Sequence, residues 1–376
     1  MKLLFYLTRF PGVGGIETVT SIISQALINK GYQIDIISHC QQNDNYNSNN
    51  IRLWRMPNTK RWASKKNYIY IDQILKNNDY NAIIYQDSYA PTESIICSIS
   101  KKHKIPLYVF EHNSPLFIYN KRNLDSILTV KGFLRRFFHP YLLYQERKRK
   151  RMLLDTSKQY ILLSKQFISE FCKLVDYRNT EDKVIFIHNP IAIKTPANIE
   201  EKENIVLYVG RLTPEKRVDA MLKVWKKIQN STAIDWKFII VGDGTERPKL
   251  EKMVQSLKLR NVKFEGFQDP SKYYQRAKIF LMMSKFEGWG LTLIESMQYG
   301  VVPIAQKNFS SIIDIIDNGL NGYIVDDRLE SIQYRISDLI SNKNLLMTMS
   351  ENAIMKSKLF NIESIIPQWI DLLKKQ

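Results

Sequence analysis

Short apolar runs recur along the chain, and most are followed by a segment with apolar residues at helical spacing. In the first half these runs are residues 2–7, 33–38, 82–85, 107–110, 160–163 and 184–187. Apolar runs of four to eight residues that alternate with helical patterns are typical of parallel strands buried on both faces. The pattern therefore predicts a parallel, doubly wound sheet covered by helices.

The pattern pauses near Asn189, where Pro190, Pro196 and an acidic run at 200–203 indicate an interdomain linker. A second series of apolar runs follows at residues 205–209, 237–241, 262–264, 279–282 and 302–305. We predict an α/β protein of two doubly wound, Rossmann-like domains, 1–196 and 197–360, which face each other across a cleft. A last helical segment covers 361–376. Ligands of such sheets bind at the carboxyl ends of the strands.

Composition narrows the protein class. The 376 residues are 44% hydrophobic and 24% charged, which is typical of a folded protein and gives enough length for two cores. The first ten residues hold too few apolar positions for a signal peptide, and no later run has membrane-spanning length. Cys40, Cys97 and Cys172 lack metal-ligand spacing, which favours a reducing compartment. We therefore predict a cytoplasmic protein.

Basic residues are concentrated in the first half of the chain. Of the formal net charge of +18, residues 1–196 contribute most, with 29 Lys and Arg against 15 Asp and Glu. From Lys131 to Arg151 the sequence reads KGFLRRFFHPYLLYQERKRKR, in which aromatic residues accompany cations. Such a segment suits an anionic membrane surface. A core-facing helix with a solvated basic face explains the segment equally well. Nucleic acid is a third reading, but no nucleic-acid-binding motif supports it.

The richest segment, residues 284–303, reads SKFEGWGLTLIESMQYGVVP and places Glu287 and Glu295 on either side of a Gly-rich turn with seven residues between them. The turn opens a helix-forming run, so that the first backbone N–H groups of the helix are free to bind an anion. The two glutamates can then reach both ends of an elongated ligand with a charged middle, and a nucleotide sugar has that shape.

This segment, with EGWGL before the second glutamate and YGVVPI after it, resembles the signature of the retaining glycosyltransferases of family 4, which have the GT-B fold. The resemblance implies that Glu295 holds the ribose hydroxyls and that Glu287 holds the donor sugar. It also implies that the segment between them binds the donor, through Gly288, Trp289, Gly290, Leu291 and Thr292. In this fold the terminal helix crosses back to the first domain.

Two cations follow the strand predicted at 205–209. The run VGRLTPEKR resembles the stretch that in the family supplies an Arg and a Lys to the donor diphosphate, which here are Arg211 and Lys216. Glycosyl transfer releases a nucleoside diphosphate, and fixed cations stabilise the charge that grows on it in the transition state. Arg217 we interpret as surface charge and Asp243 as a turn or capping residue. The resemblance places Phe267 near the nucleotide base.

The first domain offers three more candidates. Gly14 and Gly15 lie in the first strand-to-helix loop, where a backbone without Cβ can approach a diphosphate. His112 follows the strand predicted at 107–110 and resembles the family's active-site histidine, which lies close to the transferred sugar and would orient it. His188 we interpret as structural.

We therefore expect a retaining, metal-independent hexosyltransferase that uses a nucleoside diphosphate sugar, with UDP implied by resemblance. Its acceptor would be a hydroxyl of a glycan or a polyprenyl-diphosphate-linked intermediate in cell-surface polysaccharide biosynthesis. We expect the protein to be peripheral on the inner face of the cell membrane, bound through Lys131 to Arg151. No cofactor or metal is expected, because no Asp-any-Asp triplet occurs and Arg211 and Lys216 can neutralise the diphosphate. A nucleotide-sugar epimerase of the same fold and a non-enzymatic membrane-surface or nucleic-acid-binding protein are the alternatives.

Overall fold

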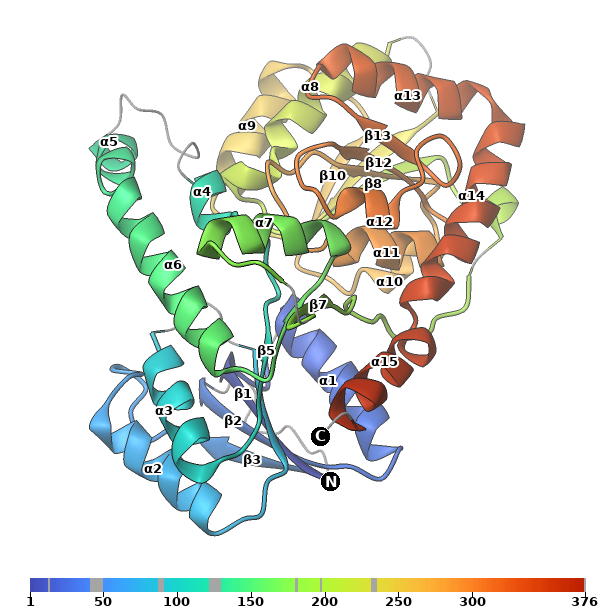
Figure 1. Ribbon diagram of the computed structural model, residues 1–376. Helices are drawn as coiled ribbons and strands as arrows, with labels where there is room; N and C mark the ends of the chain where they lie inside the picture. Colours follow the sequence, from blue (N-terminus) through green and yellow to red (C-terminus); the bar gives the residue numbers. More distant parts are fainter. Residues whose placement is uncertain are drawn as a thin grey trace. The chain divides into compact units, whose positions relative to one another are not determined.

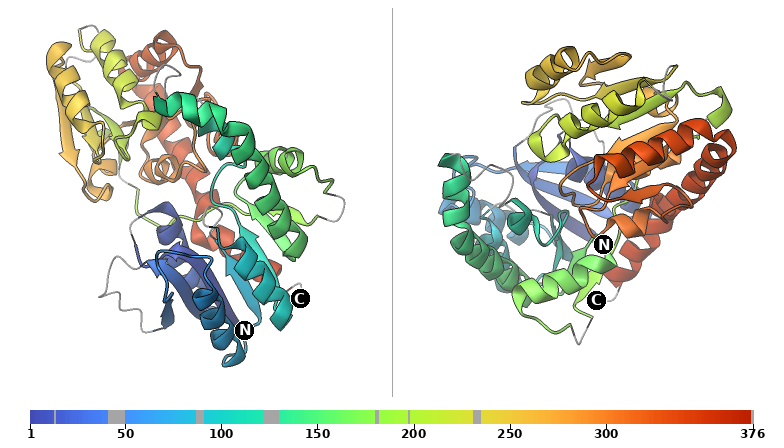
Figure 2. Two further views of the ribbon diagram at one scale, coloured as in Figure 1. Left: turned by 90° about the vertical axis from the view of Figure 1, so that its left-hand side faces the viewer. Right: turned by 90° about the horizontal axis from the view of Figure 1, so that it is seen from above.

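The computed structural model describes residues 1–12, 14–40, 50–86, 91–121, 130–179, 182–196, 198–230 and 235–374. The chain forms two compact units (Figure 1). The first unit holds Met1–Pro190 together with the end of the chain from Ile365 onward, and the second unit holds Ile191–Ser364. Each unit contains one parallel sheet with helices on both sides of the strands (Figure 2).

The first unit has a seven-stranded sheet of order β3-β2-β1-β4-β5-β6-β7. Its strands are β1 (Lys2–Arg9), β2 (Gln33–Cys40), β3 (Ile51–Arg55), β4 (Ala82–Tyr85), β5 (Leu107–Phe110), β6 (Gln159–Leu162) and β7 (Val184–Phe186). The central strands are apolar on both faces: Leu3, Leu4, Phe5 and Tyr6 of β1 are all fully buried. Helices cover both faces of the sheet, which explains the continuous apolar runs in place of alternation.

The helices of the first unit are α1 (Gly15–Ile28), α2 (Lys65–Lys76), α3 (Glu93–His103), α4 (Phe117–Lys121), α5 (Val130–Phe137), α6 (His139–Thr156) and α7 (Lys165–Val175). The end of the chain adds α15 (Ile362–Lys374), in which the buried Trp369 stacks on Phe110 of β5 at a centroid distance of 4.1 Å. The last helix therefore belongs to the core of the first unit.

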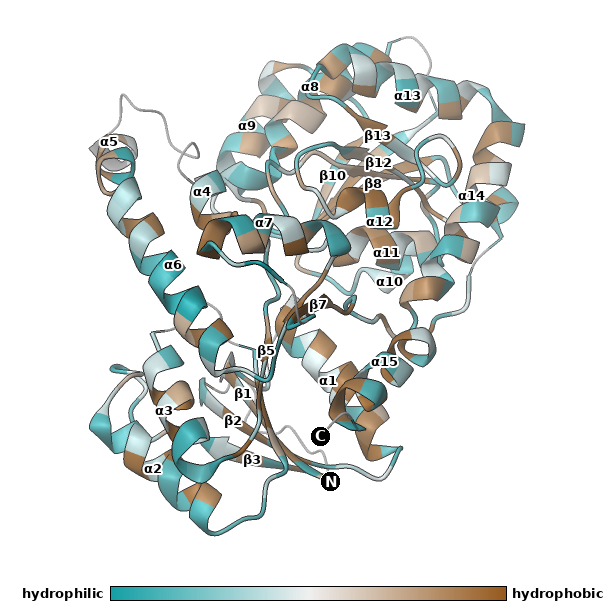
Figure 3. Cartoon of the chain, in the orientation of Figure 1, coloured by the Kyte–Doolittle hydropathy of each residue, from teal (hydrophilic) through white to brown (hydrophobic). Residues whose placement is uncertain are grey.

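The second unit has a six-stranded sheet of order β10-β9-β8-β11-β12-β13. Its strands are β8 (Ile205–Val209), β9 (Lys237–Val241), β10 (Val262–Gly266), β11 (Ile279–Met282), β12 (Val302–Gln306) and β13 (Tyr323–Val325). Its helices are α8 (Val218–Ile228), α9 (Arg247–Ser256), α10 (Ser271–Tyr274), α11 (Leu291–Gln298), α12 (Ile312–Ile315), α13 (Leu329–Ser341) and α14 (Lys343–Ser357), and short 3-10 turns span Ile199–Glu201, Pro214–Lys216 and Lys358–Phe360. The outer helices carry both hydrophobic and hydrophilic residues, as expected of helices with one buried and one exposed face (Figure 3).

The predicted α/β fold class is confirmed, because both sheets are parallel throughout the described strand pairs. All eleven predicted strands are present to within two residues at each end. Two strands were missed, β3 and β13. The predicted last helix runs from Ile362 to Lys374, and residues 375 and 376 lie outside the described residues.

Candidate functional site

Several of the predicted site residues lie at the carboxyl edge of the second unit's sheet. Strands β8 and β11 are hydrogen-bonded neighbours and run parallel, so the segments that follow them begin at the same edge. After β8 come Gly210, Arg211 and the 3-10 turn Pro214–Lys216. After β11 comes the loop 283–290 that leads into α11. The topology thus brings together two segments that are more than sixty residues apart in the sequence.

Lys216 and Glu287 form an ion pair across this edge. The Lys216 Nζ lies 2.5 Å from the Glu287 Oε1, and the two side chains are 16% and 13% exposed. The same two segments are also joined by their backbones, since the Lys285 N–H donates to the Glu215 carbonyl at 2.8 Å. The predicted sugar-binding acid and the predicted diphosphate-binding cation are therefore neighbours, and each neutralises the other.

The Arg211 side chain is exposed, whereas its backbone is fixed by a hydrogen bond from a buried residue. The buried Tyr208 hydroxyl donates to the Arg211 carbonyl at 2.9 Å. This contact fixes the turn immediately after β8 while the guanidinium stays accessible to solvent. A cation on a fixed backbone is suited to bind a diphosphate with two parallel hydrogen bonds.

Helix α11 begins directly after the Gly-rich turn. Gly290 precedes the helix with a φ of 79°, in the left-handed region that glycine adopts at little cost. The first backbone N–H groups, including those of Leu291 and Thr292, have no acceptor inside the helix. Trp289 contributes differently from the prediction: its side chain is buried and packs edge-on against Phe360 at 5.6 Å. Only its backbone could take part in binding.

Glu295 lies on α11, one turn beyond the start of the helix. Its carboxylate is partly buried, and its Oε2 accepts a hydrogen bond from the Tyr274 hydroxyl at 3.1 Å. Burial raises the pKa of the Glu295 carboxyl, and the Tyr274 hydrogen bond opposes that shift. Glu295 was predicted from the sequence, whereas its partner Tyr274 was not, because no motif marks Tyr274.

The remaining candidates of the second unit differ in setting. Phe267 follows β10 and is 73% exposed, so its ring is open to a stacking partner. Asp243 accepts from the Gly244 N–H at 2.8 Å and pairs with Arg247, as expected of a turn residue. Arg217 was interpreted as surface charge, but it is partly buried and its Nη1 donates to the Gln306 Oε1 at 3.1 Å, at the end of β12.

In the first unit, His112 lies two residues beyond β5 and is only 6% exposed. Burial lowers the pKa of its imidazole to about 4, and the Asn189 side chain partly offsets the shift. The ring is therefore neutral at physiological pH and can both donate and accept a hydrogen bond. The predicted structural role of His188 agrees with its Nδ1, which lies 2.7 Å from the Leu163 carbonyl.

Gly14 and Gly15 lie at the start of α1, where Gly14 is the residue before the helix. The Glu17 carboxylate lies over this turn: a Cβ on Gly14 would come within 2.4 Å of Glu17 Oε2. An anion at this helix end would therefore meet a carboxylate, whereas hydroxyl groups could donate to it. The local chemistry favours sugar hydroxyls over phosphate at Gly14 and Gly15.

Helices α5 and α6 carry a group of large exposed apolar side chains in the first unit. We call it the α5–α6 patch; its members are Phe133, Leu134, Phe137, Phe138, Tyr141, Leu142 and Tyr144. Phe137 stacks on Phe133 at 6.3 Å and lies edge-on to Phe138 at 5.1 Å. Large exposed apolar patches mark surfaces that meet another molecule or a membrane.

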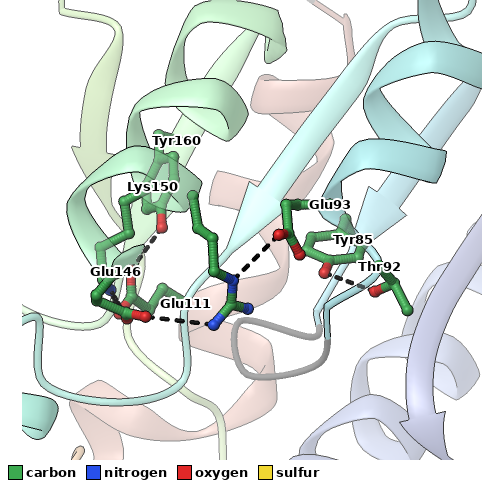
Figure 4. A network of polar contacts seen from close by, with 8 residues as sticks. Tyr85, Thr92, Glu93, Glu111, Glu146, Lys150 and Tyr160 are labelled. Carbon is green, nitrogen blue, oxygen red and sulfur yellow. Dashed lines mark hydrogen bonds and ion pairs between the residues drawn. The ribbon is translucent and has the colours of Figure 1, made fainter. Parts of the chain in front are cut away.

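The basic run after this patch divides into exposed and buried members. Arg147 and Lys148 are exposed. Lys150 is buried and pairs with Glu111 and Glu146, the latter at 3.4 Å (Figure 4). The Tyr160 hydroxyl donates to the other oxygen of Glu111 at 2.6 Å. Burial raises the pKa of the Glu146 carboxyl, and Lys150 opposes the shift. This network fixes the second half of α6 to the strand end that carries His112.

Two family models match consecutive parts of the chain. Residues 13–194 match the model described as Glycosyltransferase Family 4, and residues 191–356 match the model described as Glycosyl transferases group 1. Together these matches span both units almost completely.

Whole-length relatives carry glycosyltransferase names. An uncharacterized glycosyltransferase of Haemophilus influenzae is 25% identical over 383 residues, which covers 99% of each chain. A Campylobacter jejuni protein is 25% identical over 385 residues, covering 99% of this chain and 98% of the relative. It is named GalNAc-alpha-(1->4)-GalNAc-alpha-(1->3)-diNAcBac-PP-undecaprenol alpha-1,4-N-acetyl-D-galactosaminyltransferase.

Solved structures of the same architecture cover the complete chain. The lipopolysaccharide outer core galactosyltransferase WaaB in its apo form has a TM-score of 0.75 at 20% identity, with 100% of both chains covered. Anabaena Alr3699/HepE in complex with UDP and glucose has a TM-score of 0.74 at 16% identity, again with 100% of both chains covered. At these identities the likeness establishes the fold.

Proposed function

Because this chain belongs to the glycosyltransferases of the GT-B fold, we propose that it transfers a hexose from a UDP-sugar to a hydroxyl group with retention of anomeric configuration. The acceptor we propose is a glycan or a polyprenyl-diphosphate-linked glycan in cell-surface polysaccharide biosynthesis. Support comes from the undecaprenol-linked substrate in the name of the Campylobacter jejuni relative and from the UDP and glucose bound to the Anabaena protein.

The arrangement of Lys216, Glu287 and Arg211 carries this proposal. Two cations and one acid lie on neighbouring segments at the carboxyl edge of the sheet, beside a helix whose first N–H groups are free. A UDP-sugar has a dianionic middle between two polyhydroxyl groups. The site matches it in order: cations and amides for the diphosphate, Glu287 for the sugar and Glu295 for the ribose.

The Lys216–Glu287 ion pair gives donor binding a specific consequence. Without donor, the ammonium and the carboxylate neutralise each other at 2.5 Å. When the diphosphate arrives, Lys216 gains a second anionic partner, and the Glu287 carboxylate can accept hydrogen bonds from sugar hydroxyls. During transfer the bond between the anomeric carbon and the β-phosphate oxygen breaks, so that charge grows on the diphosphate beside Lys216 and Arg211.

The chemistry we propose needs no metal and no protein base. The acceptor oxygen forms its bond to the anomeric carbon on the face from which UDP departs, and its proton moves to the departing phosphate oxygen. Lys216, Arg211 and the α11 amides supply the positive charge that a divalent cation supplies elsewhere. The neutral His112 imidazole would orient a sugar hydroxyl without adding charge.

The test is sugar transfer in EDTA with UDP-glucose, UDP-galactose and their N-acetyl forms, supplied with a polyprenyl-diphosphate-linked acceptor. Lys216→Met and Glu287→Gln should each lower kcat/KM by about 100-fold or more, since each removes a charge used in the transition state. The matched control is Lys227→Met, which breaks a Lys–Glu pair on the exposed surface of the same unit and should keep full activity.

The anomeric configuration of the product, read by NMR coupling constants, checks the stereochemistry. Retention supports the proposal and inversion refutes the mechanism. Conversion of the UDP-sugar to its epimer without any acceptor would instead establish the epimerase alternative. Full activity of both site variants would refute the assignment of Lys216 and Glu287.

We further propose that the α5–α6 patch binds the anionic inner surface of the cell membrane. Among the described residues, no helix is both long and apolar enough to cross a bilayer. The patch offers aromatic rings for the interface and the exposed Arg147 and Lys148 for lipid headgroups. A lipid-linked acceptor would be held at that same surface.

Vesicle flotation distinguishes binding through the α5–α6 patch from non-specific adsorption of exposed aromatic residues. Tyr141→Ser removes an aromatic ring that is 60% exposed in the patch, and Tyr334→Ser removes one that is 64% exposed in the second unit. The first should weaken binding to anionic vesicles about tenfold and the second should not. High salt should weaken binding by the wild-type chain. Equal effects of the two substitutions, or equal binding to neutral vesicles, would refute the surface.

A further inference from the structure

Tyr274 links a buried part of the second unit to the donor site. Its hydroxyl donates to the Glu295 Oε2 at 3.1 Å, which is the one side-chain hydrogen bond of this carboxylate among the described residues. We propose that Tyr274 is a positioning residue, which holds the Glu295 carboxylate in the orientation that binds the ribose diol of the nucleotide. This inference rests on the proposed function and adds a residue that no motif marks.

The Tyr274 ring is fixed on two sides. The side chain is 1% exposed and stacks on Tyr299, the residue after α11, at 5.7 Å and an interplanar angle of 28°. Its other neighbour is Phe280 of β11, at 6.2 Å. A ring packed in this way has one orientation, so the position of the hydroxyl that donates to Glu295 is fixed.

The backbone of Tyr274 is fixed as well. The Lys202 ammonium is buried and donates to the Tyr274 carbonyl at 2.8 Å and to the Ala277 carbonyl at 3.0 Å. These carbonyls belong to the end of α10 and the residues after it, where helix geometry leaves acceptors unsatisfied. Lys202 thereby anchors the short helix that carries the tyrosine.

The arrangement leaves Glu295 able to act on a ligand. A carboxylate has two oxygens with two lone pairs each. The Tyr274 hydroxyl donates to one lone pair of Oε2, so that the other lone pairs can accept hydrogen bonds from a ligand. Glu295 keeps some exposure to solvent. The vicinal hydroxyls of a ribose are donors that a fixed carboxylate can accept together. A carboxylate free to rotate would lose part of this interaction to conformational entropy.

Protonation offers a second readout. The titratable group that acts on the Glu295 carboxylate is Tyr274. Tyr299 and Asp269 act in turn on the Tyr274 hydroxyl. Burial already raises the pKa of Glu295 and the Tyr274 hydrogen bond lowers it. Removal of the hydroxyl should therefore raise the pKa further, so that the carboxylate becomes protonated at a higher pH. Protonated Glu295 is the poorer acceptor for two hydroxyls.

The experiment is calorimetric titration of UDP and of 2′-deoxy-UDP into the full chain, as wild type, Tyr274→Phe and Tyr323→Phe. The control, Tyr323→Phe, removes a tyrosine–carboxylate hydrogen bond of the same 3.1 Å length, to Asp338, at the start of β13. Tyr274→Phe should weaken UDP about tenfold and 2′-deoxy-UDP much less, which lowers the preference for ribose. The loss should be larger at pH 5.5 than at pH 8. Tyr323→Phe should bind both as the wild type does.

Each other outcome is decisive. If Tyr274→Phe weakens UDP and 2′-deoxy-UDP equally, the tyrosine supports the fold and the inference is wrong. If it weakens neither, the hydrogen bond has no role in binding and the inference is wrong. If the wild-type chain binds neither nucleotide, the proposed UDP specificity itself fails, a result distinct from the first two.

Discussion

Replacing Lys150 by Met tests whether this member of the basic run of α6 stabilises the interior of the first unit. The substitution removes the cation that pairs with Glu111 and Glu146 inside the first unit and leaves two buried carboxylates without it. Breaking a buried ion pair from one side costs about 3–5 kcal/mol. For a unit of this size, each kcal/mol lowers the melting temperature by about 2–4 °C. The expected decrease is therefore about 6–20 °C.

The matched control is Lys148→Met, two residues earlier on the same helix. Lys148 is exposed, so the same substitution should change stability by less than about 0.5 kcal/mol. Thermal unfolding followed by near-ultraviolet circular dichroism, with several scan rates, gives both values. Adding Glu111→Gln to Lys150→Met should recover part of the loss. Equal, small shifts for Lys148→Met and Lys150→Met would refute the internal role of Lys150.

Three further predictions concern the first unit and the proposed donor site. Burial lowers the pKa of His112 in the folded chain from 6.5 to about 4. Between these pH values the unfolded chain therefore binds the proton more readily than the folded chain. The free energy of unfolding falls as the pH drops from 6.5 toward 4, by up to about 3 kcal/mol. The melting temperature of His112→Asn should therefore decline less between pH 7 and 5 than that of the wild type; identical slopes would contradict this. Trp369→Ala removes a buried ring stacked on Phe110 and should destabilise the first unit by about 3–5 kcal/mol, measured by thermal unfolding; a change below about 1 kcal/mol would show that α15 contributes little to this core. The Phe267 ring is 73% exposed, so Phe267→Ala leaves no cavity in the core and should not change the melting temperature. It should weaken UDP binding, because the ring can stack on the base; unchanged binding would exclude this contact.

The strands could be predicted because their apolar runs are continuous. Strand β3, IRLWR, was missed because Arg52 and Arg55 interrupt its apolar residues; it lies at the edge of the sheet and pairs with β2 alone. Strand β13, YIV, is a short strand between Gly322 and Asp326 that pairs with β12 at the edge of the other sheet. Both missed strands lie at an edge of their sheet, where a strand has one neighbour.

The site residues were predicted from motifs, but their contacts depend on strand order. Lys216 and Glu287 meet because β8 and β11 are neighbours, which periodicity alone does not reveal. Tyr274 reaches Glu295 from a four-residue helix that has no sequence signal of function. Lys150 shares a run with exposed cations, and only the position of Glu111 in the fold distinguishes it. Tertiary contacts of this kind are invisible to local patterns.

The most direct test of the proposed donor site is calorimetric titration of UDP and GDP in EDTA into the wild-type chain and into Arg211→Ala, with Arg260→Ala as control. Arg260 is a cation of the same unit that lies before β10, on the opposite edge of the sheet, and pairs with Asn230 at 2.9 Å. We expect UDP to bind without metal, Arg211→Ala to weaken it at least tenfold and Arg260→Ala to leave it unchanged. Absence of binding by the wild-type chain, or equal binding by Arg211→Ala, would contradict a nucleotide-sugar site at this edge.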